Sequence, residues 1–350
     1  MPCGNLYEVG RRYCALIRAV PVVLCVLVAA APASAQADFY KGRTVQIVCG
    51  YGVGGGYDLY ARTLARHLGD HIPGKPAVVV QNMTGAGGMR AANAIYTTLP
   101  KDGTVIACTN PILLMYQLMG GAQARYETGK LQWIGSLDEP NNSIIAFAKS
   151  GLRTIEDAKT REVPVPGDGP TSSMSLYPTA TNALIGTRFR VIDGYTGSAA
   201  GDLALQRGEV DARSGASLGS LFAQHGEAIR NGTVRILIQF GPRRSRRIAD
   251  VPLLQDLVGS ERDKQIAEVL GLPATVGPGY WMAPGVPEER LAAIRKAFAA
   301  TVTDPAFLAS ARQVRLELTP KTGAEVQAAV SAVAGYPKEV LAATAKMLRW

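Results

Sequence analysis

The sequence predicts an α/β fold of two lobes, each built on a parallel-rich sheet that helices cover. The chain has 350 residues, and 47% of them are hydrophobic. This length exceeds that of a domain with one ordinary hydrophobic core. Strand-like and helix-like segments alternate along most of it, and this rhythm is typical of parallel sheets. Because the pattern changes near residue 139 and again near residue 251, we assign residues 36–138 and 251–350 to the first lobe and residues 139–250 to the second.

The first 35 residues have the pattern of an export signal. Arg11, Arg12 and Arg18 precede an apolar run at residues 19–31, and Ala33 to Ala35 supplies an A-x-A site. The run is shorter than the roughly 20 residues that a spanning helix needs. We therefore expect cleavage after Ala35 and a periplasmic location; an uncleaved anchor is the alternative.

Two cysteines, Cys49 and Cys108, lie beyond this segment, each near the end of a strand-like run. They could lie on adjacent strands, either bridged in an oxidising compartment or as small buried hydrophobes. The formal net charge is +9. For an exported chain without an aromatic and basic stripe, this charge favours anionic ligands over nucleic acid. No Cys and His spacing indicates a metal site, and no cofactor is expected.

Each expected element follows from local periodicity and turn residues. In the first lobe we expect strands at 44–49, 77–80 and 104–108, with helices at 57–68 and 89–97. In the second lobe we expect strands at 143–148, 163–165, 188–192, 210–212 and 234–240, with helices beginning near 154, 173 and 200. A strand at 279–283 and helices at 287–302, 325–334 and 338–348 complete the chain.

Two glycine-rich loops each join a strand to a helix. The first runs from Gly50 to Asp58, and the second contains Gly85 to Gly88. Glycines let backbone amides approach a ligand, and the following helix N-terminus favours an anion. Two such loops at one edge of a sheet predict an anion site there, although two tight turns without a ligand remain possible. Asp58 would stabilise the first helical turn or, less simply, contact the ligand.

Two segments match the sequence patterns of known enzyme motifs. Gly50, Gly52 and Gly55 satisfy the dinucleotide fingerprint, but the second strand ends at Gln81 and Asn82 instead of an acidic residue. Gly215 to Gly219 satisfies G-x-S-x-G around Ser217. The only later histidine, His225, is too close in sequence for the usual order of a hydrolase triad. A secreted serine hydrolase is therefore a minor alternative.

The order of short motifs along about 300 residues resembles the extracytoplasmic solute receptors of tripartite tricarboxylate transporters, the Bug proteins. The shared motifs are Gly54-Gly55-Gly56-Tyr57-Asp58, Val78-Val79-Val80-Gln81-Asn82, Gly85-Ala86-Gly87-Gly88, Tyr195-Thr196-Gly197, Gly208-Glu209-Val210-Asp211 and Asp250-Val251-Pro252. The resemblance implies a hinged periplasmic binding protein of type II, the Venus flytrap class. It also implies a small organic carboxylate as ligand, membrane transporter subunits as partners, no catalysis and a monomer.

Carried onto this chain, the resemblance implies contacts from both lobes. The expected ligand-binding residues are Tyr51, Gly52, Val53, Gly54, Gly55, Gly56, Tyr57, Asp58, Gly85, Ala86, Gly87, Gly88, Asn110, Asp168, Gly169, Thr171, Ser172, Ser173, Tyr195, Thr196 and Gly197. Two contact regions depart from the family pattern. Gly50 to Val53 replaces a proline- and aromatic-rich stretch, and Gly167 to Ser173 lacks the usual histidine. A receptor that feeds a sensor kinase is the alternative within the same class.

Overall fold

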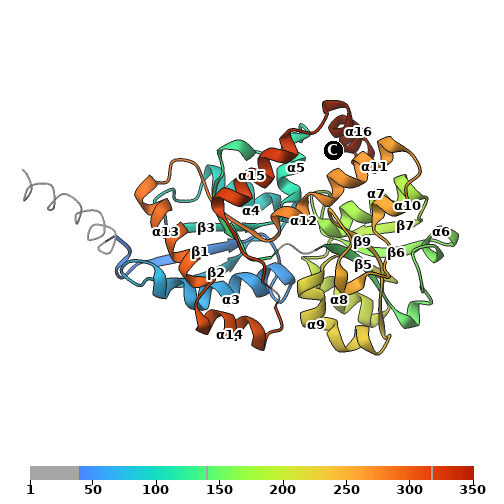
Figure 1. Cartoon of the computed structure of the whole chain (residues 1–350), viewed down its shortest axis with the longest axis horizontal. Helices are drawn as coiled ribbons and strands as arrows, with labels where there is room; N and C mark the ends of the chain where they lie inside the picture. Colours follow the sequence, from blue (N-terminus) through green and yellow to red (C-terminus); the bar gives the residue numbers. More distant parts are fainter. Residues whose placement is uncertain (1–38, 139–140, 317) are drawn as a thin grey trace, which may run out of the picture.

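The chain folds into two halves that lie side by side (Figure 1). The computed structural model describes residues 39–138, 141–316 and 318–350, so the expected export signal at residues 1–35 lies outside the described residues. We call the half that contains the six-stranded sheet the first lobe. The other half, which contains a three-stranded and a two-stranded sheet, is the second lobe.

The sheet of the first lobe has the strand order β11-β4-β10-β3-β1-β2. Its parallel part consists of β1 (Thr44–Cys49), β2 (Ala77–Asn82) and β3 (Val105–Thr109). The antiparallel part consists of β10 (Gly279–Met282), β4 (Gln132–Ser136) and β11 (Lys321–Thr322). Since β10 returns from late in the chain to pair with β3, the chain re-enters this sheet after building the second lobe.

Alternating residues of β1 pack into two hydrophobic cores, one on each face of the sheet. Val45, Ile47 and Cys49 pack on one face with residues of α3, α13 and α14, whereas Val48 packs on the other with residues of α4, α5 and α15. This alternation is the period of two expected for a strand covered on both faces. The helices are α3 (Gly56–His71), α4 (Met89–Thr97), α5 (Ile112–Leu118), α13 (Glu288–Thr301), α14 (Pro305–Gln313) and α15 (Gly323–Ala334).

The second lobe has one parallel and one antiparallel sheet, so the expectation of a parallel-rich sheet in this lobe is corrected here. Strands β6 (Val163–Gly167) and β7 (Phe189–Asp193) are parallel. Strand β5 (Asn142–Phe147), in contrast, pairs antiparallel with both β8 (Ala212–Ser217) and β9 (Val234–Phe240). The strand expected at 210–212 was misplaced: β8 begins at Ala212 and continues to Ser217, and this extension brings Gly215 and Ser217 to the boundary with the first lobe.

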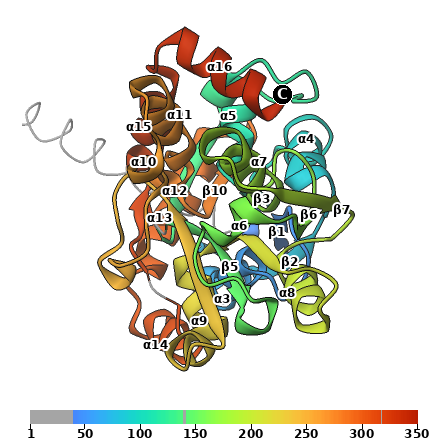
Figure 2. The same cartoon turned by 90° about the vertical axis from the view of Figure 1, so that its right-hand side faces the viewer.

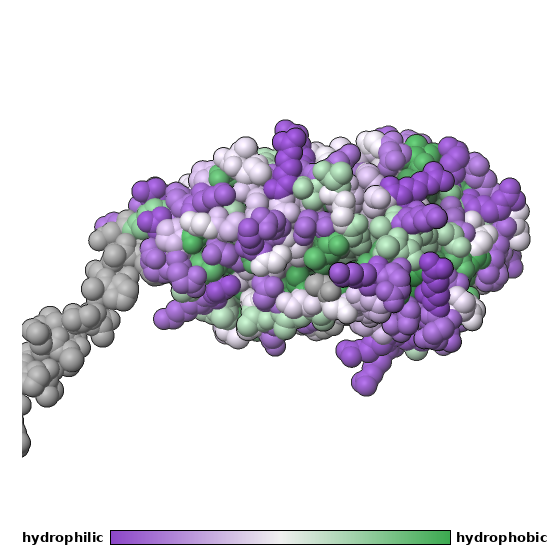
Figure 3. Space-filling view, turned by 90° about the horizontal axis from the view of Figure 1, so that it is seen from above, coloured by the Kyte–Doolittle hydropathy of each residue, from purple (hydrophilic) through white to green (hydrophobic). Residues whose placement is uncertain are grey.

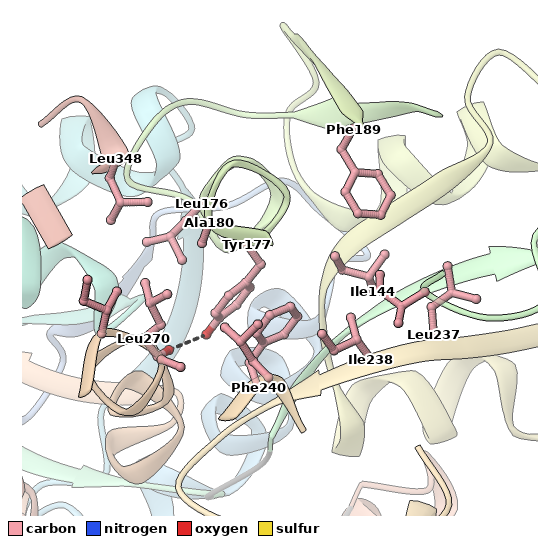
Figure 4. Packing of buried hydrophobic residues seen from close by; sticks show 14 of the residues in the cluster. Ile144, Leu176, Tyr177, Ala180, Phe189, Leu237, Ile238, Phe240, Leu270 and Leu348 are labelled. Atoms are coloured by element: carbon pink, nitrogen blue, oxygen red, sulfur yellow. Dashed lines mark hydrogen bonds between the residues drawn. The ribbon is translucent and has the colours of Figure 1, made fainter. Parts of the chain in front are cut away.

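The largest core cluster joins the second lobe to late helices of the chain. Tyr177 of α7 stacks on Phe240 of β9 with ring centroids 4.1 Å apart, and its hydroxyl donates to the carbonyl of Leu270 at 3.4 Å (Figure 4). The helices of this half are α6 (Asp157–Thr160), α7 (Ser173–Ile185), α8 (Ser198–Arg207), α9 (Leu218–Arg230), α10 (Leu254–Leu257), α11 (Glu261–Gly271) and α16 (Lys338–Leu348). Helix α12 (Pro273–Val276) follows α11 and places Val276 in a core of the first lobe.

Helices α10, α11 and α16 contain residues that we assigned to the first lobe. Their residues Leu254, Leu270 and Leu348 belong instead to the same buried cluster as Tyr177 and Phe240, and both views place α11 and α16 together beside α7 (Figures 1 and 2). Local periodicity cannot show which body a helix packs on. The division of the chain into lobes at residues 139 and 251 thus stays a prediction, while these contacts tie parts of the last segment to the second lobe.

Cys49 and Cys108 occupy paired positions on β1 and β3, as the sequence suggested. Both are buried and carry free thiols. Within the described part of the chain, no helix has the length and apolar character to cross a membrane. The face seen from above is mostly hydrophilic and carries smaller apolar areas (Figure 3).

Candidate ligand-binding site

The N-terminal ends of four helices meet where the two lobes face each other. Two small cavities, of about 30 and 20 Å³, share the lining residues Gly56, Tyr57, Ser198 and Gly215. The first turns of α3 and α8 thus contribute to both cavities. Ser217 and Ser220 bring the start of α9 to the larger cavity, and Ser172, Ser173 and Met174 bring the start of α7 to the smaller one.

Local sequence explains why these helices begin here. The Ser172 hydroxyl accepts a hydrogen bond from the amide of Met174 at 2.9 Å and caps α7. Ser217 caps α9 in the same way through the amide of Ser220. Helices α3 and α8 follow Gly55 and Gly197, which provide no capping side chain. The first turns of α3 and α8 therefore keep backbone amides that can donate hydrogen bonds to an anion.

The two cavities offer hydrogen-bond donors at helix N-termini and, in the part of the chain that the structure describes, contain no basic side chains. Among the described residues that line them, none is Lys, Arg or His. Each helix N-terminus carries about half a positive charge from its aligned peptide dipoles. An arrangement of neutral N–H and O–H donors at such ends binds a small anion and needs no counter-charge from a side chain.

Tyr51 and Tyr57 form one wall of the smaller cavity. Their rings stack with centroids 4.6 Å apart, and the Tyr51 hydroxyl donates to the Gly87 carbonyl at 2.8 Å. Burial raises the pKa of both phenols well above the ordinary value, so both stay protonated. Asn110 lines the larger cavity, and its Oδ1 accepts from the amide of Ile112 at 2.9 Å.

The second glycine loop lies in a wider groove of about 430 Å³ beside the small cavities. Gly85 to Gly88 form one side of this groove, and Asp168, Gly169, Tyr195 and Thr196 lie on the other. Asp168 lines both this groove and the smaller cavity. Those expected residues that line these spaces therefore divide into an inner group at the helix ends and an outer group along the groove.

The glycine loops also contact the second lobe directly. The Gly52 amide donates to the Thr196 carbonyl at 3.0 Å, and the Gly87 amide donates to the Asp168 carbonyl at 2.7 Å. In addition, the Thr171 hydroxyl donates a hydrogen bond to the Ala86 carbonyl at 2.7 Å. A Cβ at Gly52 would lie 2.8 Å from the Thr196 oxygen, so glycine is needed for this approach. Amides that we expected to cradle an anion are thus partly used to join the lobes.

Asp58 has a structural role in the first loop. Its carboxylate accepts from the Gly54 amide and from Arg62 Nε at 2.9 Å each, and from Asn82 Nδ2 at 2.8 Å. Although burial alone would raise its pKa, these hydrogen bonds, that of Arg62 first, hold the pKa of Asp58 below the ordinary value. Both oxygens are occupied within the first lobe, which favours the first of the two roles considered for this residue.

Several expected contacts do not line the cavities or the groove. These are Gly52, Val53, Gly54, Asp58, Thr171 and Gly197. Val53 is 67% exposed, and most of the others connect the lobes or brace a loop. The structure adds lining residues that sequence reasoning missed. These are Tyr60, Pro111, Asn142, Met174, Ser198, Gly215, Ser217 and Ser220, with Pro273, Gly277 and Pro278 from the late segment.

The residues of the apparent hydrolase motif do not form a catalytic relay. The Ser217 hydroxyl lies 2.7 Å from that of Ser220 and caps α9. His225 Nε2 instead lies 3.2 Å from Asp202 Oδ2, and Asp202 also binds the buried guanidinium of Arg213. No group of three or more His, Cys, Asp or Glu within the described segments is arranged to hold a metal ion.

Comparison with known proteins identifies the class. A profile described as tripartite tricarboxylate transporter family receptor matches residues 60–329. The chain therefore belongs to this family of periplasmic solute-binding receptors, as its motifs implied. A relative from Cupriavidus necator, described as the UPF0065 protein in the gbd 5′ region, is 29% identical over 236 residues, which cover 65% of this chain and 68% of that protein.

Solved structures share the fold. The periplasmic binding protein BugD matches with a TM-score of 0.67 at 20% identity, covering 88% of this chain and 98% of BugD. The Rhodopseudomonas palustris protein MatC, solved with malate, has a TM-score of 0.64 at 18% identity and 86% and 99% coverage. Rpa4515 of the same organism, solved with adipate, has a TM-score of 0.66 at 18% identity and 88% and 98% coverage. These likenesses confirm the two-lobed binding-protein fold.

Proposed function

We propose that this receptor captures a small organic carboxylate between its lobes in the periplasm and delivers it to the membrane subunits of a tripartite tricarboxylate-type transporter. The observation that carries the proposal is the meeting of helix N-termini at cavities without basic side chains. Carboxylates suit such sites because each oxygen accepts several N–H or O–H bonds. The malate and adipate bound to the two R. palustris proteins are carboxylates of this kind.

In this proposal, the inner cavities hold the carboxylate. The amide groups at Gly56 and Tyr57 and the hydroxyls of Ser198, Ser217 and Ser220 supply donors from both lobes. The Ser198 hydroxyl already lies 3.4 Å from the Gly56 amide, a long hydrogen bond across the lobes. An anion that binds both groups would strengthen a contact that is weak on its own. The ligand would therefore favour the closed arrangement of the lobes.

Direct bonds between the lobes support a role for closure. They involve both glycine loops, and Gln224 adds a side-chain bond to the Gly54 carbonyl at 3.2 Å. In a hinged receptor the membrane partner distinguishes closed from open molecules, so ligand contacts made by both lobes become a transport signal. A sensor kinase that reads the same closure is the second candidate within this class.

A thermal-shift screen of the purified receptor tests the proposal. Mono- and dicarboxylates, hydroxy acids, aromatic acids and amino acids would each be added at millimolar concentration, with matched sulfate and chloride salts as controls. A ligand present at about 1,000 times its Kd stabilises the folded state by about 4 kcal/mol. We expect saturable stabilisation by at least one carboxylate, with the compound recovered unchanged by NMR. Absence of any shift across the panel would contradict the carboxylate assignment, and conversion of the compound would contradict a receptor role.

The remaining parts of the proposal concern processing and assembly. We propose that the mature chain begins after Ala35, is exported and acts as a monomer. Intact mass of the protein isolated from the periplasm would locate the cleavage site, and sedimentation at micromolar concentration would give the oligomeric state. A chain that retains residues 1–35 in the membrane fraction would support the anchor alternative.

A further inference from the structure

Asp168 occupies a fixed place between the two lobes. It follows directly after β6, and its backbone carbonyl accepts the Gly87 amide of the opposite lobe at 2.7 Å. The neighbouring Gly169 packs so close to Ala86 that a Cβ there would lie 2.9 Å from the Ala86 Cα. Because the backbone on both sides of the contact is held, the position of the Asp168 side chain is set when the lobes meet.

Asp168 lines the smaller cavity, and one oxygen of its carboxylate, Oδ1, is buried without a hydrogen-bond partner among the described residues. Tyr51, Tyr57, Ser172 and Ser198 line the same cavity. Burial, with the nearby Asp193 carboxylate adding to it, raises the pKa of Asp168 to about 7.

Three donors near Asp168 form hydrogen bonds with other acceptors. The Tyr51 hydroxyl donates to the Gly87 carbonyl, and the Gly169 amide and the Ser175 hydroxyl both donate to Asp193. None of the described residues that line the smaller cavity is Lys, Arg or His. A buried carboxylate oxygen without a donor is costly, and the cost falls when a bound molecule supplies the missing hydrogen.

We propose that Asp168 determines specificity by accepting a hydrogen bond from the solute, so that the receptor selects small carboxylates that also carry a hydroxyl or ammonium group. This inference rests on the proposed function. The carboxylate of the solute binds at the helix N-termini of the larger cavity, and its donor group faces Asp168 in the smaller one. The two cavities share lining residues, so a molecule with both groups on a short carbon chain can reach both.

The proposal separates solutes that differ by one group. An unsubstituted acid such as propionate or succinate would leave Asp168 Oδ1 without a donor. Lactate and malate offer a hydroxyl, whereas alanine and aspartate offer an ammonium. A site built around a buried acceptor rejects the analogue that lacks the donor more strongly than it rejects a change in apolar size.

Calorimetric titration of these six acids tests the proposal. We expect the best hydroxy or amino acid to bind the wild-type protein about ten- to hundredfold more tightly than its unsubstituted analogue. In Asp168→Ala this preference should disappear, while the unsubstituted acid binds as well as before or better. Asp168→Asn keeps an acceptor oxygen without the charge, so it should retain a preference for the hydroxy acid and lose any preference for the amino acid. Asp250→Asn, at an exposed position of the second lobe, is the matched control and should change neither.

A second measurement on the wild-type protein avoids any folding defect of the variants. Of the titratable groups beside Asp168, Tyr51 and Tyr57 stay protonated and Asp193 adds negative charge. Between about pH 6 and about pH 8, ionisation of Asp168 should strengthen binding of an ammonium-bearing acid and weaken that of a diacid without a donor.

The outcomes separate the two proposals. Binding of unsubstituted acids as tight as that of their substituted analogues, with Asp168→Ala unchanged, would overturn the Asp168 inference and leave the receptor function standing. An affinity ratio between the ammonium-bearing acid and the unsubstituted diacid that stays constant from about pH 6 to about pH 8 would also overturn it, because the charge of Asp168 would then not act on the bound solute. If none of the six acids and no compound of the wider panel bound the protein, this result would instead count against the proposed function itself.

Discussion

The Gly52 amide donates to the Thr196 carbonyl at 3.0 Å and joins the first glycine loop to the second lobe. Because a Cβ at Gly52 would lie 2.8 Å from that oxygen, Gly52→Ala should hold the lobes apart. Overpacking of this kind costs about 1–3 kcal/mol, so we expect ligand binding to weaken about 5- to 150-fold. Calorimetry with the best carboxylate would measure the change.

The matched control for this variant is Gly129→Ala. Gly129 is exposed, and a Cβ there meets no atom within 4 Å. It should bind ligand like the wild type. Unchanged affinity in Gly52→Ala would show that the close contact between the lobes is not needed for binding.

Asp58 should contribute stability and not ligand contact. Asp58→Asn weakens the hydrogen bonds from Arg62 and the Gly54 amide to a buried carboxylate, and we expect the free energy of unfolding to fall by about 1–3 kcal/mol. The folded-state pKa of Asp58 lies below its unfolded value. Its stabilising effect is therefore full above the unfolded pKa of about 4 and is lost as the pH falls toward the folded pKa.

Denaturant unfolding of the wild type and Asp58→Asn at a series of pH values would measure this effect. The difference in unfolding free energy should be constant near neutral pH and shrink in acid. A variant of unchanged stability that no longer binds any carboxylate would instead assign Asp58 to the ligand.

Cys49 and Cys108 are paired across β1 and β3, yet both thiols are free and buried. We expect two reactive thiols per mature chain when the protein is denatured without reductant, and no reaction while it is folded. Thiol titration under both conditions is the measurement. No reactive thiol in the denatured protein would mean that the two cysteines are bridged.

Ser217 should act as a helix cap and not as a nucleophile. Ser217→Ala removes the acceptor for the Ser220 amide, and loss of an N-cap costs about 0.5–2 kcal/mol. We expect the unfolding midpoint to decrease and ester hydrolysis to be absent from both proteins. Hydrolysis by the wild type that Ser217→Ala abolishes would support the hydrolase alternative.

Local sequence patterns predicted much of the fold. The bounds of β1, α4 and β9 agree with the expected segments, because each has a clear period and is bounded by turn residues. Strand β4 and helix α11 were not predicted. Within the described residues, strand β4 joins the sheet through β10 and β11, which come from more than 140 residues later. Pairing over such distances leaves no local signal.

The candidate site was predicted in outline. The glycine loops, Asn110 and the loop at Asp168 all lie where the lobes meet. Ser198, Ser217 and Ser220 were missed, although a serine just before or within a first helical turn is a recognisable sign of a helix N-terminus. Ser217 also fits the G-x-S-x-G pattern, which is typical of a nucleophile and not of a helix cap. That four such ends converge is a property of the tertiary structure alone.

The most direct test of the receptor function is a calorimetric titration of the purified mature protein with the carboxylate that stabilises it most in the screen. The proposed function predicts saturable binding at one site per chain, with the acid recovered unchanged afterwards. It also predicts weaker binding when Ser198→Ala removes a hydroxyl donor between the lobes. Absence of saturable binding, or identical affinity in Ser198→Ala together with binding at a site outside the inter-lobe cavities, would contradict it.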